Sequence, residues 1–420
     1  MITSGHVVVV GLGFGDEGKG AVVDALCRDG SVSAVVRFNG GAQAAHNVVA
    51  AGRHHAFSQF GAGTLAGVPT HLSRHVLVEP IALAAESREL AALGVADPLR
   101  LLTVHAEALL TTPVHVAANR AREDARGPDR HGSCGKGIGE TVWYSLLARR
   151  GARPGDVVEG QVVPGEPGPA PTVGDCARPA VLRRKLDALA RFYEPLVGDG
   201  TAVDELVSLY EAFADAVRVV RGDEVGRLAA GGRLVFEGAQ GVLLDERHGF
   251  HPHTTWSSVT PRNARALLGG RPARVLGVTR TYQTRHGAGP LPTEDAAVLE
   301  RFPERHNATG RYQGAWRAGH LDAVLLRHAV AACGGVDALA VTHLDAQDLR
   351  VATSYRTDGG AVTRLPAGPD RTAFLAGCAP RLRPLTDPVE WLEREFGLPV
   401  AVTGRGPDRA DYAVRVPVPR

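Results

Sequence analysis

Short runs of apolar, β-branched residues alternate along the chain with stretches that have helical spacing. The runs are apolar at consecutive positions, which is typical of strands covered on both faces. Strands that alternate with helices favour an α/β fold, with a mainly parallel central sheet flanked by helices. The predicted strands are Val7–Val10, Ala34–Phe38, Leu234–Phe236, Val275–Val278, Ala338–Thr342 and Val400–Val402.

Helical spacing predicts helices over Ile81–Leu93, Val181–Tyr193 and Leu321–Ala332. Pro80 stands directly before the first of these stretches, and Gly94 stands directly after it. Proline at the first helical position and glycine just beyond the last one are typical helix boundaries. The pattern therefore gives the first helix a defined start and a defined end.

Two stretches rich in glycine and proline interrupt the alternation of strands and helices. Arg153–Pro179 predicts an exposed loop or insertion, and Thr357–Asp370 predicts an excursion near the C-terminus. The sequence has no internal repeat and no low-complexity tail. We therefore expect one α/β domain over residues 1–420, with loop and helical insertions.

The chain has 47 basic and 45 acidic residues among its 420 positions, so its net charge is close to neutral. This balance predicts no strong positive electrostatic field that would attract nucleic acid or a membrane surface. The five cysteines are scattered without a C-x-x-C pair, which favours reduced thiols over disulfides or zinc. Without a secretory-signal pattern or an apolar run of about 18 residues, the sequence predicts a cytoplasmic protein.

The glycine-rich segment Gly11–Gly20 follows the first predicted strand directly. A buried strand that leads into such a loop and then a helix is typical of a phosphate-binding site. Glycines let backbone N–H groups approach an anion, and the helix N-terminus adds a favourable dipole. Asp16 and Glu17 would repel phosphate in this loop. We therefore expect Asp16 to have a role beyond phosphate binding.

The loop fits two nucleotide-binding templates. Gly13–Lys19 matches G-x-x-x-x-G-K, but Gly20 stands where a P-loop carries the Ser or Thr that binds Mg²⁺. The glycines of the loop also match G-x-G-x-x-G, which requires an acid about 20 residues further on. Ala34–Asn39, in that zone, contains no acid. A nucleoside triphosphate is therefore favoured over a dinucleotide, and a glycine-rich turn without a ligand remains the third interpretation.

Six further motifs follow the loop in a fixed order: Gly40–Asn47, Gly132–Gly139, Glu237–Asp245, Thr284–Pro290, Thr342–Asp345 and Thr403–Arg409. Together with Gly11–Gly20 they make nearly the whole chain resemble adenylosuccinate synthetase. The resemblance implies a P-loop-type α/β fold, GTP as co-substrate, Mg²⁺ and a homodimer. It also implies that the protein is a ligase that joins L-aspartate to C6 of IMP in purine biosynthesis.

The chemistry of this reaction explains an acid inside a phosphate loop. Deprotonation of N1 makes O6 of the purine nucleophilic, and attack on the γ-phosphate of GTP gives a 6-phosphoryl intermediate that the amine displaces. By resemblance, Asp16 is the general base and a metal ligand. His46 donates to the phosphoryl group in transfer, and Gln240 holds the 6-oxygen. The backbone carbonyl of Ala45 is the second expected metal ligand.

The resemblance also implies the remaining binding residues. Asp345 is expected to recognise the N1–H and N2–H₂ groups of guanine. Arg149 is expected to reach the acceptor site of the partner subunit. The residues expected to bind GTP are Gly15, Glu17, Gly18, Lys19, Gly20, His343, Asp345, Thr403, Gly404 and Gly406. Those expected to bind the acceptor nucleotide are Gln43, Ser133, Cys134, Arg149, Gln240, Thr255 and Arg311. Those expected to bind the amine donor are Thr309, Arg311 and Arg317.

Departures from the family pattern gather where the acceptor and the amine donor are expected to bind. Cys134 replaces a threonine and is a weak donor, and Lys136 replaces an arginine and loses its bidentate geometry. His286 replaces a small apolar residue near the ribose, and His343 replaces a lysine beside Asp345. The amine-donor loop Thr309–Asp322 is longer and poorer in arginine than the family loop.

Two interpretations of these departures remain open. The chain is either a divergent enzyme with the family's substrates, or a specialised paralogue for a modified purine nucleotide in nucleoside natural-product biosynthesis. In the second case the amine donor is aspartate or another amino acid. A P-loop protein that has lost catalysis is a third interpretation, and the presence of Asp16, His46 and Gln240 together speaks against it.

Overall fold

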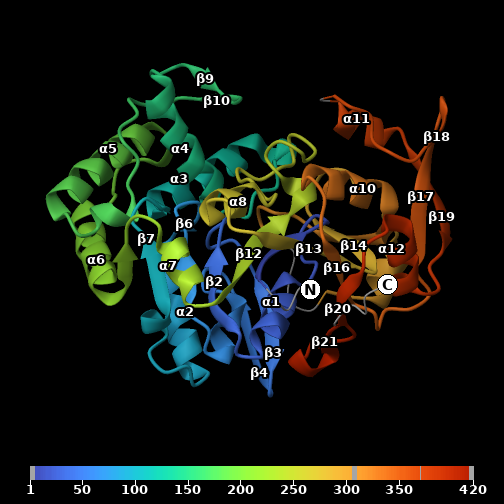
Figure 1. The fold of residues 1–420 in the computed structure, drawn as a ribbon. Coiled ribbons are helices and arrows are strands. Elements are labelled where there is room, and N and C mark those ends of the chain that lie inside the picture. Colours follow the sequence, from blue (N-terminus) through green and yellow to red (C-terminus); the bar gives the residue numbers. More distant parts are fainter. Residues whose placement is uncertain (1–4, 305–309, 369, 416–420) are drawn as a thin grey trace.

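A ten-stranded sheet runs through the middle of the molecule (Figure 1). The computed structural model describes residues 5–304, 310–368 and 370–415. Neighbouring strands of this sheet are parallel, except for the antiparallel pair β20–β21 at one edge. In spatial order the strands are β11 (Arg218–Val220), β7 (Leu102–His105), β5 (Thr70–Leu72), β2 (Val32–Arg37), β12 (Arg233–Gly241), β1 (His6–Gly11), β13 (Ala273–Arg280), β16 (Ala338–Thr342), β20 (Val400–Gly404) and β21 (Tyr412–Val414).

The central strand β1 separates two hydrophobic cores. Val7 and Val9 belong to one core cluster, whereas Val8 and Val10 belong to the other, and all four are fully buried. Successive side chains of a strand point to opposite faces of the sheet, so a wholly apolar strand must be covered on both sides. The apolar run that predicted this strand therefore also predicted its central place.

Helices cover both faces of the large sheet (Figure 1). Helices α3, α5 and α6 contribute to one core cluster, and α8, α10 and α12 contribute to the other. The α-helices are α1 (Lys19–Cys27), α2 (Pro80–Ala92), α3 (Pro113–Arg126), α4 (Ile138–Arg150), α5 (Pro179–Val197), α6 (Val203–Ala216), α7 (Glu224–Ala230), α8 (Arg262–Leu268), α9 (Ala296–Arg301), α10 (Ala323–Ala332), α11 (Arg371–Ala376) and α12 (Pro388–Phe396). Short 3₁₀-helices are η1 (Ala62–Ala66), η2 (Pro98–Leu101), η3 (Gly127–Asp129), η4 (Val173–Asp175), η5 (Val242–Leu244) and η6 (Arg409–Asp411).

A second sheet of five strands lies on the C-terminal side of the molecule, at the right of Figure 1. Its strands are β14 (Tyr282–His286), β15 (Trp316–Asp322), β17 (Arg350–Thr357), β18 (Gly360–Val362) and β19 (Ala379–Pro384). Two-stranded pairings complete the fold. They join β3 (His46–Ala50) to β4 (Arg53–Phe57), β6 (Leu77–Val78) to β8 (Leu109–Leu110), and β9 (Val157–Val158) to β10 (Gln161–Val162).

The structure confirms the expected fold class, the six predicted strands and the helices α2 and α5. Pro80 is the first residue of α2, and Gly94 just beyond its end has φ of 89°. The prediction was wrong at the start of α10, because Leu321 and Asp322 belong to β15. The carboxylate of Asp322 accepts hydrogen bonds from the N–H groups of Val324 and Leu325, so the helix begins only at Ala323.

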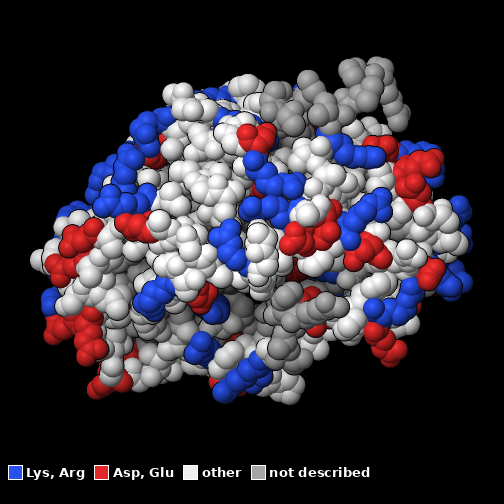
Figure 2. Space-filling view, turned by 90° about the horizontal axis from the view of Figure 1, so that it is seen from below, with Lys and Arg blue, Asp and Glu red and all other residues white. Residues whose placement is uncertain are grey.

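The two glycine- and proline-rich stretches contain more structure than loops. Arg153–Pro179 holds the β9–β10 hairpin and η4, and its last residue begins α5. Thr357 ends β17, and the chain turns back through β18. Within residues 5–304, 310–368 and 370–415, no helix is long and apolar enough to cross a membrane. Figure 2 shows basic and acidic side chains interspersed over the face seen from below.

The sequence motifs lie at the ends of neighbouring strands. β1 leads into the glycine-rich loop, β2 leads into Gly40–Asn47, and β12 carries Gln240 near its end. On the other side of β1, β16 leads into Thr342–Asp345 and β20 ends at Gly404. Because these strands are parallel, their carboxyl ends share one edge of the sheet, where ligands bind in open α/β folds.

A buried ion pair joins α1 to the C-terminal segment of the chain. The Asp24 side chain is 1% exposed, and its two carboxylate oxygens accept hydrogen bonds from Arg409 at 2.7 and 2.6 Å. Arg28 adds hydrogen bonds to the carbonyl oxygens of Arg409 and Tyr412. These contacts hold the segment that follows β20 against the helix that follows the glycine-rich loop.

We expect Asp24→Ala to lower the free energy of unfolding by about 3 kcal/mol, because it removes the counter-charge of a half-buried guanidinium. Urea denaturation measures the change. Asp97→Ala is the control, because Asp97 and Arg100 form an exposed pair for which a loss of about 0–1 kcal/mol is expected. Equal losses in the two variants would contradict the role given to Asp24.

Candidate active site

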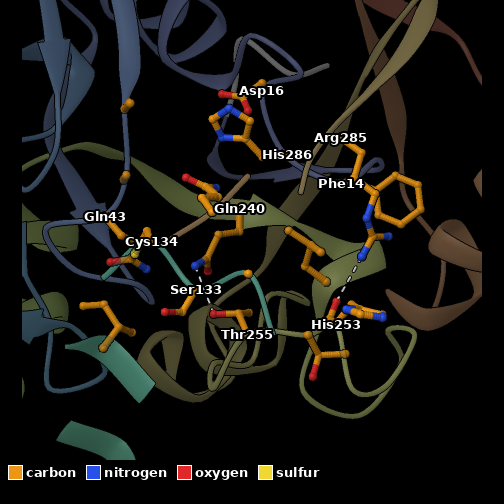
Figure 3. Close-up of a pocket in the computed structure, with 18 of the residues that line it drawn as sticks. Phe14, Asp16, Gln43, Ser133, Cys134, Gln240, His253, Thr255, Arg285 and His286 are labelled. Carbon is orange, nitrogen blue, oxygen red and sulfur yellow. Dashed lines mark hydrogen bonds between the residues drawn. The ribbon is translucent and has the colours of Figure 1, made fainter. Parts of the chain in front are cut away.

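A cavity of about 1060 Å³ opens at the carboxyl edge of the parallel strands. Its wall is built from the glycine-rich loop, the loop after β2, the loop before α4, the end of β12 and the C-terminal loops. Figure 3 shows Asp16, Gln43, Ser133, Cys134, Gln240, Thr255 and His286 around it. Residues from distant parts of the chain therefore meet in one chamber.

The two acids of the glycine-rich loop have different surroundings. Glu17 is 2% exposed, and its Oε1 accepts hydrogen bonds from the N–H groups of Gly13 and Gly15 at 3.0 and 2.9 Å. Its Oε2 lies 2.6 Å from the ammonium group of Lys19. The carboxylate thus occupies the kind of N–H nest that binds an anion.

Two glycines make room for this carboxylate. A Cβ on Gly11 would lie 2.1 Å from Glu17 Oε2, and a Cβ on Gly241 would lie 2.4 Å from Glu17 Oε1. Because Gly241 is the last residue of β12, the Glu17 carboxylate packs the loop directly onto the strand that carries Gln240. Glu17 was expected to bind GTP, which stays a prediction, and its side chain organises the loop itself.

Asp16 faces the cavity instead. Its φ of 58° lies in the left-handed region, which is unusual for a residue other than glycine and turns its backbone away from the path of the helix. Arg280 donates a hydrogen bond to the Asp16 carbonyl oxygen at 3.1 Å. Burial raises the pKa of the Asp16 carboxyl to about 6, with Glu17 adding to the rise and Lys19 opposing it. A carboxylate with such a pKa is suited to accept a proton near neutral pH.

His46 is held by a carboxylate that the sequence analysis did not identify. Its Nδ1 lies 2.5 Å from Oε1 of Glu237, whose Oε2 accepts a hydrogen bond from the N–H of Ala62 at 2.9 Å. Burial would raise the pKa of Glu237, but Arg37 and the bond from His46 hold it below its usual range. Burial lowers the pKa of His46, while Glu237 opposes this.

The contact between Gly20 and His46 explains why the loop lacks the usual Ser or Thr. A Cβ on Gly20 would lie 2.7 Å from His46 Cβ and 2.9 Å from its carbonyl carbon. Such distances leave no room for any side chain. The close approach of α1 to β3 therefore excludes the hydroxyl that a P-loop carries at this position.

Gln240 lies at the end of β12 with φ of 64°. Its Nε2 donates to Thr255 Oγ1 at 3.0 Å, and its buried Oε1 has no partner within the described residues. Asn39 stabilises this turn, because its side chain donates to the carbonyl of Ala239 and accepts from its N–H. The amide of Gln240 is thus presented to the cavity by a fixed backbone.

Four of the residues predicted to bind the acceptor nucleotide line the cavity together with Gln240: Gln43, Ser133, Cys134 and Thr255. Both amide atoms of Gln43 are buried and have no partner in the described ranges. Asn119 Nδ2 donates to Ser133 Oγ at 3.0 Å, and burial raises the pKa of the Cys134 thiol.

Arg149 is exposed near the end of α4 and does not line the cavity of its own chain. Its neighbour Arg150 does, and it pairs with Glu159 at 2.8 Å. The expectation that Arg149 serves a partner subunit stays a prediction.

The residues predicted to bind the nucleotide base divide into two groups. His343, Asp345 and Gly406 line the cavity, whereas Thr403 and Gly404 end β20 without lining it. Burial holds the pKa of His343 well below its usual range, so its ring is neutral. Its Nδ1 lies 2.9 Å from Thr342 Oγ1, which holds the ring in the wall of the cavity.

Most of the glycine-rich-loop residues that were predicted to bind phosphate also line the cavity. Gly15, Gly18, Lys19 and Gly20 line it, and so does Ala45. The side chain of Glu17 lies in the interior of the loop.

The structure does not bring the predicted amine-donor arginines into the cavity. Arg311 pairs with Asp124 at 3.2 Å, and Arg317 pairs with Glu294 and donates to the carbonyls of Gly287 and Gly289. Neither residue lines the cavity. Thr309 lies outside the described residues, so its predicted role stays a prediction.

Other residues that were given no role in the sequence line the cavity, namely His253, His286, Glu304 and Gln313. His286 was noticed in the sequence as a departure but received no role. Glu237 could have been found, because an acid that directly follows the apolar run Leu234–Phe236 in a buried strand requires a partner. Gln313 carried no such signal, since polar residues are ordinary in loops.

Comparison with known proteins decides the family. A family model described as adenylosuccinate synthetase matches residues 8–386. The chain belongs to the adenylosuccinate synthetase family. The adenylosuccinate synthetase of Marinomonas sp. (strain MWYL1) is 33% identical to it, over 97% of this chain and 98% of that protein. The adenylosuccinate synthetase of Methylococcus capsulatus is 34% identical, with the same coverage of both chains.

Two solved structures share the fold. The fully ligated adenylosuccinate synthetase from Plasmodium falciparum superposes with a TM-score of 0.82, over 98% of this chain and 100% of that chain. The cyanophage S-2L succinoaminodeoxyadenylate synthetase, bound to dGMP and to dATP as an energy donor, gives a TM-score of 0.62 over 98% and 95%. Both are 19% identical to this chain, so the likeness shows the fold alone.

Family membership confirms the predicted relationship, the α/β fold class and the enzyme class, a ligase that forms carbon–nitrogen bonds. It also sets aside the dinucleotide interpretation that the loop alone had left open. The roles of individual residues remain predictions, which the geometry of the cavity now makes testable.

We expect Gly20→Ser, which would restore the usual P-loop residue, to impair this enzyme. The added Cβ collides with the His46 backbone, so the free energy of unfolding should fall by about 1–3 kcal/mol and turnover should fall with it. Thermal unfolding and a turnover assay measure both effects. Gly359→Ser is the control, because a Cβ there meets only Thr357 Oγ1 at 3.8 Å. A fully active, fully stable Gly20→Ser protein would refute the proposed contact.

Proposed function

We propose that this enzyme joins L-aspartate to C6 of IMP, using GTP to convert the 6-oxygen into a phosphoryl leaving group. One observation carries the proposal. Asp16, His46 and Gln240 come from three separate strand ends and line the same cavity at the carboxyl edge of the sheet. A base, a donor to phosphate and an amide for the 6-oxygen are the groups that this chemistry requires.

In the first step, Asp16 takes the N1 proton of the purine, and Gln240 Nε2 donates to the 6-oxygen. The oxygen then attacks the γ-phosphate of GTP. Lys19, which lines the cavity, stabilises the charge on the phosphates. The raised pKa of Asp16 suits a carboxylate that must hold the N1 proton during this step.

His46 stabilises the phosphoryl group during transfer. Its Nδ1–H donates to Glu237, so its Nε2 carries a proton for the phosphate only when the ring is an imidazolium. Glu237 favours that charged form, and so do the negative charges of the bound phosphates. We therefore infer that phosphate binding charges His46, which then donates to the oxygen on which charge develops.

The cavity also fits a magnesium ion. Asp16 and Ala45 both line it, and the Asp16 carboxylate and the Ala45 carbonyl are hard oxygen ligands of the kind that would hold Mg²⁺. When bound, the ion would neutralise charge on the transferring phosphate. Asp16 would then serve the metal and the N1 proton from the same position, consistent with an acid in a phosphate loop.

In the second step, the amino group of aspartate attacks C6, and phosphate leaves. The whole chain acts as one unit in this proposal, since the strand ends that hold the substrates span it from Asp16 to Gly406. We further propose a homodimer in the cytoplasm in which Arg149 supplies a phosphate contact to the partner's site, because Arg149 is exposed beside the chamber of its own chain.

Two observations favour a second candidate acceptor, a purine nucleotide other than IMP. The unpartnered amide of Gln43 and the thiol of Cys134 line the acceptor side, where a different nucleotide would make different contacts. The cyanophage neighbour was solved with dGMP. Incubation with GTP and Mg²⁺, with aspartate and either IMP or dGMP, tests both, and mass spectrometry identifies the adduct. A faster adduct with IMP supports the proposal, and a faster adduct with dGMP overturns it in favour of the specialised paralogue.

We expect Asp16→Asn to abolish adduct formation while GTP still binds, because asparagine keeps the shape of the side chain but takes no proton. The loss in turnover should be on the order of 10² to 10⁴. Product formation and equilibrium binding of GTP measure the two properties separately. Turnover close to that of the unmodified enzyme would contradict the general-base role.

We expect His46→Ala to lower turnover by a factor on the order of 10² to 10³, the usual effect of removing one donor to a developing charge. Glu237→Gln should lower turnover in the same direction, because the imidazolium loses its counter-charge. Steady-state assays at saturating GTP measure both variants. If His46→Ala turns over normally, His46 has only a structural role.

A further inference from the structure

His286 lines the cavity and is held there by its neighbours. It is the last residue of β14, and its ring packs edge-on against Trp316, with ring centroids 4.9 Å apart and an interplanar angle of 82°. The side chain of Gln313 hydrogen-bonds the imidazole. Nε2 is buried and has no partner within the described residues. A buried polar atom without a partner is costly, and a ligand commonly completes it.

The bond to Gln313 sets the tautomer of the ring. Because Nε2 has no partner, the contact with Gln313 is made at Nδ1, where the ring N–H can donate to the amide oxygen of Gln313. In the neutral ring the lone pair then lies on Nε2. In Figure 3 the His286 ring lies at the end of the cavity where Asp16 and Gln240 are drawn.

The second step of the proposed reaction needs a proton acceptor of its own. An amino acid reaches the enzyme as an ammonium ion, which has no lone pair with which to attack C6. Asp16 already holds the N1 proton after phosphoryl transfer, so it is no longer a base. Gln43 and Gln240 do not titrate in this range, and Lys19 is a cation.

We propose that His286 Nε2 accepts a proton from the ammonium group of the amine donor and so generates the nucleophile. The inference rests on the proposed function and adds a catalytic residue to it. The freed lone pair forms the C6–N bond, and the C6–O bond breaks with its electron pair leaving on phosphate. The second nitrogen proton departs with that phosphate as hydrogen phosphate, and the imidazolium returns its proton to water.

The charges around His286 favour it over His253, which also lines the cavity and has one buried ring nitrogen without a partner within the described residues. Glu304 lines the same cavity, and its charge stabilises the imidazolium form of His286, although burial lowers the pKa of the ring. His253 instead lies beside Arg285, whose charge disfavours a second cation. The charge of Glu304 thus favours the imidazolium form of His286, whereas the charge of Arg285 opposes the imidazolium form of His253.

The two half-reactions can be measured separately with GTP that carries oxygen-18 in its β,γ-bridge. Reversible transfer to IMP, without an amine, moves the label into non-bridging positions of the β-phosphate. Adduct formation with aspartate reports both steps together. We expect His286→Ala to keep the isotope exchange within about threefold of the unmodified enzyme and to lose ligation by a factor on the order of 10² to 10⁴.

His286→Asn is a second variant for the case in which His286→Ala fails to fold. It keeps a polar side chain beside Gln313 but takes no proton, so it should lose ligation and keep exchange as His286→Ala does. His54→Ala, on the β3–β4 hairpin outside the cavity, is the control and should leave both rates unchanged. Glu304→Gln should slow ligation more than exchange, because the imidazolium loses a stabilising charge.

Two results would overturn the inference. Ligation by both His286 variants within about threefold of the unmodified rate would show that Nε2 takes no proton. Equal loss of exchange and ligation in both variants would show that His286 acts only on the structure of the cavity. Absence of exchange in the unmodified enzyme with IMP would instead refute the proposed function, on which the inference rests.

Discussion

Glu17 folds its carboxylate back onto the N–H groups of Gly13 and Gly15 and holds Lys19 beside it, and the geometry of the cavity follows from this contact. The carboxylate fits only because Gly11 and Gly241 lack a Cβ, so it also fixes the loop against the end of β12. Asp16 is left facing the cavity, near the strand that presents Gln240. The two neighbouring acids of the loop therefore differ in role. Glu17 stabilises the loop, and Asp16 is free to face a ligand.

A second buried acid, Glu237, holds His46, the residue that is proposed to donate a hydrogen bond to phosphate. Glu237 lies in β12 beside Arg37 of β2 and receives His46 from the start of β3. A charge buried in this way destabilises a fold unless it is paired and hydrogen-bonded, and both conditions are met here. The central strands of the sheet thereby carry charged groups to the edge where the cavity opens, while the apolar runs below them hold the two cores together.

Much of the architecture could be predicted because strands buried on both faces leave an unmistakable apolar run, as Val7–Val10 does. The second sheet was missed because its strands, such as Trp316–Asp322, mix polar and apolar residues. Asp16, His46 and Gln240 were found through motifs, whereas the inward turn of Glu17 depends on glycines 11 and 241, which are adjacent only in the fold. Two ion pairs could likewise not be predicted, because each joins separate segments of the chain. They are Arg311 with Asp124 and Arg317 with Glu294.

The central claim is that the 6-oxygen of the purine leaves as phosphate. IMP labelled with oxygen-18 at O6 tests this claim most directly, in a reaction with unlabelled GTP and aspartate. Mass spectrometry of the released inorganic phosphate then shows where the labelled oxygen went. The account predicts one labelled oxygen in each phosphate released. Unlabelled phosphate formed together with the adduct would contradict it, because the oxygen would then have left C6 without ever being phosphorylated.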